Sequence, residues 1–115
     1  MKTPEDFFDN WTVQVRKGLL ELYILNALDG TDRYGYDLVK TLVAMPGLSV
    51  TEGTIYPLLS RLRVQGLLKT YIQEASGGPP RKYYALTEEG RQSMALMNKH
   101  FDALIKRGRA LRNKE

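Results

Sequence analysis

Apolar residues recur along the chain at helical spacing in four places. The pattern predicts helices over residues 11–28, 34–45 and 51–65, and a fourth helix that begins after Thr87. Asn10 is the expected cap of the first helix, because its side-chain oxygen can accept from a first-turn backbone N–H. The first helix is apolar over most of its circumference, which is typical of helices buried on several sides. In so short a chain, we therefore expect this helix to pack partly against a second subunit.

The third predicted helix is clearly amphipathic. Its apolar stripe at i, i+3, i+4 and i+7 consists of Ile55, Leu58, Leu59 and Leu62. Counting 100° per residue places Ser60 opposite this stripe. Tyr56 and Arg63 then flank one side, and Thr54 and Arg61 flank the other. A polar face of this kind is free to meet a partner.

Two β-like runs follow, at residues 67–74 and 81–86, and a turn-forming cluster at 75–80 separates them. They predict an antiparallel hairpin with Arg81 and Lys82 just beyond its tip. The predicted fold class is therefore mainly α with a small β-hairpin: a winged helix-turn-helix with an added C-terminal dimerisation helix. The second and third helices are separated by a short Pro-Gly linker and followed by a basic hairpin, and a helix presented in this way fits the major groove of DNA. The expected division is therefore an N-terminal extension (1–10), a DNA-binding domain (11–87) and a dimerisation helix with a basic tail (88–115).

The charge of the 115-residue chain is unevenly distributed. Its formal net charge is +4, but residues 1–56 carry −3 and residues 57–86 carry +4. Residues 87–105 carry −1, and the tail at 106–115 carries a further +4. The tail is explained by the preference for cations at a helix C-terminus. The internal excess falls on the third helix and the hairpin, where it suits contacts to DNA phosphates.

Several segments together resemble the PadR-like family of bacterial winged-helix transcriptional regulators. They are YGYDL at 34–38, TEGTIYPLLSRL at 51–62, GLL at 66–68 and GPPRKYYALTEEG at 78–90. The short C-terminal helix resembles the smaller subgroup of that family. Two positions depart from the family pattern: Thr51 replaces a usual Ser, and Arg63 replaces a frequent Glu. The resemblance implies a homodimer, usually a repressor, that binds an inverted-repeat operator and dimerises through its first and last helices.

The helix, the hairpin and the resemblance together give a set of candidate DNA-binding residues. They are Tyr36, Thr51, Glu52, Thr54, Tyr56, Ser60, Arg61, Arg63, Arg81 and Lys82. Other roles stay open for some of them. Arg61 can instead pair with an acidic side chain, Tyr36 can pack in the core, and Thr51 can simply cap its helix.

A second set of candidates concerns the subunit interface. The last helix carries an a/d-type seam, and an aromatic group lies near the start of the first helix. The residues expected at a dimer interface or in a cavity for a small apolar inducer are Phe7, Phe8, Trp11, Val15, Met94, Met97, Phe101 and Leu104. Ordinary packing within one chain is the alternative.

Other classes of function find little support. His100 is the only histidine and there is no cysteine, so the sequence offers no metal cluster and no His–Cys pair. We expect no enzyme activity, no cofactor and no metal. No apolar run is long enough to span a bilayer and no secretory signal is evident, so a cytoplasmic location is expected. Two rivals remain, a winged-helix protein–protein adaptor and a membrane-surface protein anchored by its basic tail.

Overall fold

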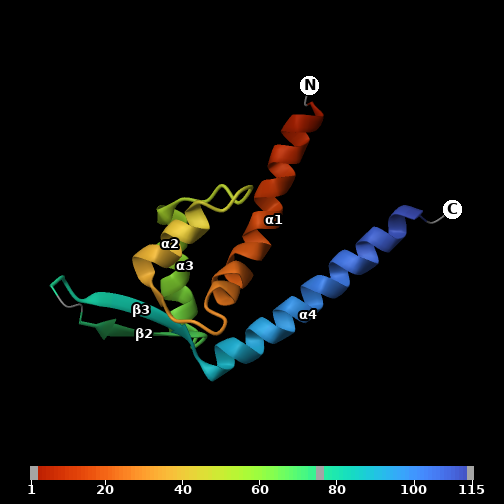
Figure 1. Cartoon of the computed structure of the whole chain (residues 1–115). Coiled ribbons are helices and arrows are strands. Elements are labelled where there is room, and N and C mark those ends of the chain that lie inside the picture. The colour runs from red at the N-terminus through yellow and green to blue at the C-terminus, as the bar shows by residue number, and fades with distance from the viewer. Residues whose placement is uncertain (1–2, 75–76, 114–115) are drawn as a thin grey trace.

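The computed structural model describes residues 3–74 and 77–113 and has the expected order of elements (Figure 1). The helices are α1 (Pro4–Ala27), α2 (Gly35–Val43), α3 (Glu52–Val64) and α4 (Glu88–Ala110), followed by a 3-10 turn, η1 (Leu111–Asn113). The strands are β1 (Arg33–Tyr34), β2 (Leu68–Gln73) and β3 (Arg81–Leu86). The predicted fold class is confirmed. Residues 75–76 of the predicted turn, 114–115 of the tail and 1–2 lie outside the described residues.

The first helix begins earlier than its apolar pattern predicts. Thr3 caps α1 in a reciprocal box: its hydroxyl oxygen accepts from the Asp6 N–H at 3.1 Å, and its own N–H donates to the Asp6 carboxylate at 3.2 Å. Pro4 follows at the first helical position, where its missing N–H costs nothing. The prediction of a helix starting at residue 11 with Asn10 as its cap is therefore wrong. Residues 4–10 form the first turns of α1.

The sheet has three strands, in the order β1–β3–β2, and all pairs are antiparallel. The hairpin matches its prediction, with Leu68 opposite Leu86 and Gln73 opposite Arg81. The two-residue strand β1 was not predicted, because two residues are too few to show a strand period. It pairs Arg33 with Tyr84, and it thereby fixes the start of α2 against the base of the wing.

One hydrophobic core joins α1, α2, α3, the wing and the start of α4. Its fully buried residues include Ile24, Leu25, Leu38, Ile55 and Leu59. Because Ile55 and Leu59 are anchored in this core, the opposite surface of α3 must face outward. Leu58, which was predicted as part of the same stripe, lies at its edge and is only partly buried.

Helix α4 starts at the base of the wing and runs away from it (Figure 1). As predicted, Thr87 caps it: the hydroxyl accepts from the Gly90 N–H at 2.9 Å and donates to the Gly66 carbonyl at 2.6 Å. Helices α1 and α4 meet at a reciprocal amide pair, Asn26 with Asn98, at 2.7 and 3.1 Å. Beyond this contact the two helices diverge (Figure 1). No helix in the described part of the chain is long and apolar enough to cross a membrane.

Candidate nucleic-acid interface

Helix α3 presents a polar surface because Ile55, Leu59 and Leu62 of its apolar stripe are buried in the core. Glu52, Thr54, Tyr56, Ser60 and Arg63 are all exposed. Thr51 occupies the N-cap position, but its side chain makes no capping hydrogen bond. The first-turn N–H groups of α3 therefore lack a side-chain cap, and such groups favour an anion.

One flank of α3 faces the start of α2 and strand β3. Tyr56 lies on this flank, and Tyr84, Tyr34 and Tyr36 are minor contributors to the electrostatic environment of its hydroxyl. The pKa of Tyr56 is raised above its ordinary value. Partial burial is the largest cause, and the Glu52 carboxylate is the second. Any tyrosine is protonated at neutral pH, since its ordinary pKa is about 10, so the exposed Tyr56 hydroxyl can donate a hydrogen bond to a phosphate.

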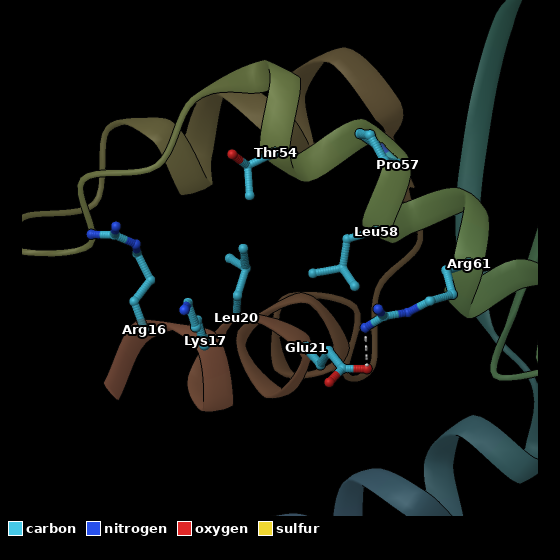
Figure 2. A pocket seen from close by; sticks show the side chains of 8 residues that line it. All are labelled: Arg16, Lys17, Leu20, Glu21, Thr54, Pro57, Leu58 and Arg61. Carbon is cyan, nitrogen blue, oxygen red and sulfur yellow. Dashed lines mark ion pairs between the residues drawn. The ribbon is translucent and has the colours of Figure 1, made fainter. Parts of the chain in front are cut away.

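The other flank of α3 faces α1 across a groove of about 480 Å³. Figure 2 shows Thr54, Leu58 and Arg61 directed from α3 toward α1. Arg61 forms an ion pair with Glu21 of α1 at 3.0 Å, and both side chains keep substantial solvent exposure. The structure therefore shows Arg61 in the acid-paired state that the sequence left open. Its guanidinium is held at the edge of the groove.

The wing carries Arg81 and Lys82 as the first two residues of β3, and both are exposed. Because successive side chains of a strand point to opposite faces, these two cations serve different sides of the wing. The Arg81 guanidinium lies over the Tyr34 ring, 4.9 Å from its centroid, and the Lys82 ammonium lies 5.5 Å from the centroid of Tyr84. Each cation therefore has an aromatic ring that restricts its position.

A run of tyrosine rings supports Arg81, and sequence reasoning missed it. Tyr71 stacks on Tyr83 with centroids 5.6 Å apart and an interplanar angle of 11°. Tyr34 lies 6.1 Å from Tyr83 and 6.0 Å from Tyr36, whose ring also holds the Lys40 ammonium at 5.1 Å. The tyrosines were visible in the sequence, but Tyr34 joins Tyr83 only because β1 pairs with β3. Tyr36 itself is half exposed rather than buried in the core.

At the end of this run, the Tyr71 hydroxyl donates to the Asp32 carboxylate at 2.7 Å. This hydrogen bond raises the pKa of Tyr71 above its ordinary value, because ionisation of the phenol would break it. The bond joins β2 to the loop before β1 and so ties together the two outer strands of the sheet.

The interface candidates divide into three groups. Val15, Met97, Phe101 and Leu104 line one groove of about 410 Å³ between α1 and α4. Phe7, Phe8 and Trp11 do not line it; they lie on the first turns of α1, each more than half exposed. Met94 is buried in the core of its own chain, which is the alternative that the sequence left open for this residue. Among the described residues no cluster of acidic, histidine or cysteine side chains suits a metal ion.

The comparisons with known proteins agree with this geometry. The model of the "Transcriptional regulator PadR-like family" matches residues 24–96. A solved PadR family transcriptional regulator from Eggerthella lenta is 32% identical, with a TM-score of 0.80 over 96% of each chain. The transcriptional regulator YqjI of Escherichia coli is 39% identical over 77 residues, which are 65% of this chain and 35% of that protein.

A further solved structure includes DNA. Bacillus subtilis PadR in complex with operator DNA is 25% identical, with a TM-score of 0.56 over 67% of this chain and 45% of that one. This chain thus corresponds to less than half the length of that regulator and to about a third of YqjI. The matched residues 24–96 include α2, α3, the wing and the start of α4, which are the elements that form the described surface. The chain belongs to the PadR-like family of transcriptional regulators.

Proposed function

We propose that this regulator is a cytoplasmic homodimer that binds an inverted-repeat DNA operator and represses transcription. Helix α3 enters the major groove, and the wing contacts the flanking backbone or minor groove. The sequence-derived division into a DNA-binding domain up to residue 87 and a dimerisation helix after it is part of this proposal. The solved complex of Bacillus subtilis PadR with operator DNA supports it by family relationship.

One observation carries the DNA-binding proposal: the outward-facing helix α3 is accompanied by a wing that holds two exposed cations, one on each face of strand β3. Tyr56 of α3 lies beside the tyrosines at the start of α2 and on β3, and Arg81 and Lys82 project from β3. Ordered cations and hydroxyl donors around an outward-facing helix suit a duplex, whose phosphates dominate affinity and whose base edges give specificity.

The proposed dimer rests on apolar surface left uncovered in the single chain. Phe7 is 70% exposed, Trp11 54% and Leu104 51%. Phe7 and Trp11 belong to the N-terminal half of α1 and Leu104 to the C-terminal half of α4, and these two halves diverge in Figure 1. Large exposed apolar side chains in such numbers mark an interaction surface. A two-fold dimer would also present two α3 helices to two half-sites, as an inverted repeat requires.

The groove between α1 and α4 is the proposed place for a small apolar inducer. Its lining is mainly apolar, with His100 and Gln14 as polar groups at its edge. Because the groove lies between the two helices assigned to the dimer, an occupant could change the spacing of the two α3 helices and weaken operator binding. A screen of flat apolar compounds for release of a bound duplex would test this part.

Removal of the wing cations tests DNA binding directly. The Arg81→Ala/Lys82→Ala double variant should bind every duplex more weakly and show a flatter dependence of affinity on salt in gel-shift titrations. Footprinting on DNA upstream of the protein's own gene should show a protected palindrome. If the wild type protects no site and binds no duplex, the protein–protein adaptor becomes the better explanation.

A further inference from the structure

The α1 side of the groove between α1 and α3 carries charged side chains that the proposed contacts of α3 and the wing do not use. Its lining contains three cations, Arg16, Lys17 and Arg61, and one acid, Glu21. Leu20, Leu58 and Pro57 form its apolar part, and Thr54 contributes a hydroxyl. The cations outnumber the acid by two, so the groove favours an anion.

Arg16 is fixed in place by the fold. Its guanidinium donates to the Leu48 carbonyl at 3.2 Å, in the loop that leads into α3. Figure 2 shows the side chain reaching from α1 toward this loop. One N–H of the guanidinium is used in this bond, and Arg carries five. The remaining donors are thus held near the start of α3 at little further cost in side-chain entropy.

Lys17 occupies the neighbouring position on α1 and differs in its freedom. It is exposed, and it forms no ion pair within the described part of the chain. In Figure 2 it stands between Arg16 and Glu21 on the α1 side of the groove. Its ammonium is therefore available to an anion that approaches along the groove.

The placement of the groove relative to α3 indicates which anion it meets. The wing and its tyrosines lie on the Tyr56 flank of α3, whereas Thr54 and Arg61 face α1 on the opposite flank. An α-helix with its side chains is about as wide as the major groove, roughly 10–12 Å. A helix seated there has one phosphate backbone on each side. The wing reaches one backbone, and α1 borders the other.

We propose that Arg16 and Lys17 of α1, at the groove between α1 and α3, bind the phosphodiester backbone of DNA across the major groove from the wing. The inference rests on the proposed DNA-binding function and extends it to a helix otherwise assigned to the dimer. The two cations act with the wing as a clamp on either side of α3. Because they contact phosphates, they strengthen binding to every sequence and do not select the operator.

A salt titration of duplex binding tests the clamp, with a random-sequence duplex of about 30 base pairs, which is long enough for two half-sites. The Arg16→Ala/Lys17→Ala variant should bind about tenfold more weakly, and the slope of log affinity against log salt should fall by about 1–2. Lys17→Ala alone should show about half of this change. The matched control is Lys99→Ala/Lys106→Ala, which removes two exposed cations from α4 and should leave the slope unchanged.

Arg16→Ala also removes the hydrogen bond to Leu48, so thermal melting and light scattering must show that each variant folds and keeps the wild-type mass. Lys17→Ala breaks no side-chain hydrogen bond or ion pair of the described residues, so it keeps the test valid if the double variant is unstable. An unchanged salt slope in Lys17→Ala and in a folded double variant would overturn the clamp. A second result would also overturn the clamp: inorganic phosphate raises the melting temperature of the wild type but not of the double variant, while both bind the duplex equally. The groove would then hold a free anion.

Failure of the clamp differs from failure of the proposed function. If wild-type protein binds no duplex at low salt, the DNA-binding proposal itself is wrong. If the Arg81→Ala/Lys82→Ala variant loses affinity while Arg16→Ala/Lys17→Ala does not, DNA binding stands and only the clamp is rejected.

Discussion

Arg61 of the third helix and Glu21 of the first helix form an ion pair at 3.0 Å that spans the groove between them. Arg61 is a candidate DNA-binding residue, and in this structure its guanidinium is bound to the Glu21 carboxylate of the same chain. The side chains of Arg61 and Glu21 are 56% and 36% exposed, and pairs this exposed contribute at most about 1 kcal/mol to stability. DNA phosphates can therefore compete with Glu21 for Arg61.

Substitution of Glu21 by Gln should strengthen DNA binding. The Glu21→Gln variant frees Arg61 and removes a negative charge from the groove, so affinity for a random-sequence duplex should rise several-fold at low salt. Fluorescence anisotropy with a labelled duplex measures the change. Glu89→Gln, on the exposed first turn of α4, removes the same charge elsewhere. Equal gains in both variants would attribute the effect to net charge alone.

Tyr34 should contribute to DNA binding through Arg81. The Tyr34→Leu variant removes the ring beneath the guanidinium, and duplex affinity should fall about threefold to fivefold, because cation–π contacts at exposed sites contribute about 0.5–1 kcal/mol. Tyr34→Phe keeps the ring and should bind within about twofold of the wild type. In an Arg81→Ala background, Tyr34→Leu should cause no further loss. If Tyr34→Leu lowered duplex affinity as much in the Arg81→Ala background as in the wild type, Tyr34 would act independently of Arg81.

Gly90 should tolerate no side chain. A Cβ at this position would collide with the Leu67 backbone carbonyl, which accepts from the Thr87 N–H at the base of the wing. The Gly90→Ala variant should lose about 2–4 kcal/mol of unfolding free energy in urea titrations. Gly108→Ala, on the same helix with no atom near the new Cβ, should instead gain about 0.5 kcal/mol. Similar effects at both positions would contradict the close contact at Gly90.

Leu104 should be required for the proposed dimer. A charge at this half-exposed position in the groove between α1 and α4 would have to be desolvated at the interface, so Leu104→Asp should shift the protein toward monomer in light scattering. Leu96 is also exposed on α4 but does not line the groove. Leu96→Asp should therefore keep the dimer. The reverse result would move the interface to the other face of α4.

High pH should destabilise the wing through Tyr71. The hydrogen bond to Asp32 raises the pKa of Tyr71 in the folded state. The Tyr71 phenol therefore loses its proton at a lower pH in the unfolded chain than in the folded protein. The resulting stability is present below the ordinary tyrosine pKa of about 10 and is lost as pH rises through the folded value. Melting temperatures of wild type and Tyr71→Phe should therefore converge as the pH rises above about 10. A constant difference would indicate that the hydroxyl bond contributes little.

Local sequence by itself determined most of the elements. Apolar spacing gave the core stripe of α3, Thr87 was recognised as the cap of α4, and the turn cluster located the hairpin, because each depends on neighbours within a few residues. The start of α1 was missed although its signal is equally local: Thr3, Pro4 and Asp6 form a capping sequence. Apolar periodicity is weak over residues 4–10 because these first turns of α1 are exposed. A helix start predicted from periodicity therefore falls too late in the sequence.

Tertiary structure decided what the polar side chains face. The sequence placed Arg61 on a flank of α3 but could not say that Glu21, forty residues earlier, lies opposite it. It contained the tyrosines but not the contact of Tyr34 with Tyr83, which depends on strand β1 pairing with β3 across about fifty residues. It also placed Met94 in an interface seam, whereas packing of α4 on the core buries it within its own chain. Helical and strand periods fix only the direction of a side chain relative to its own element, whereas its partner is fixed by how distant elements pack together.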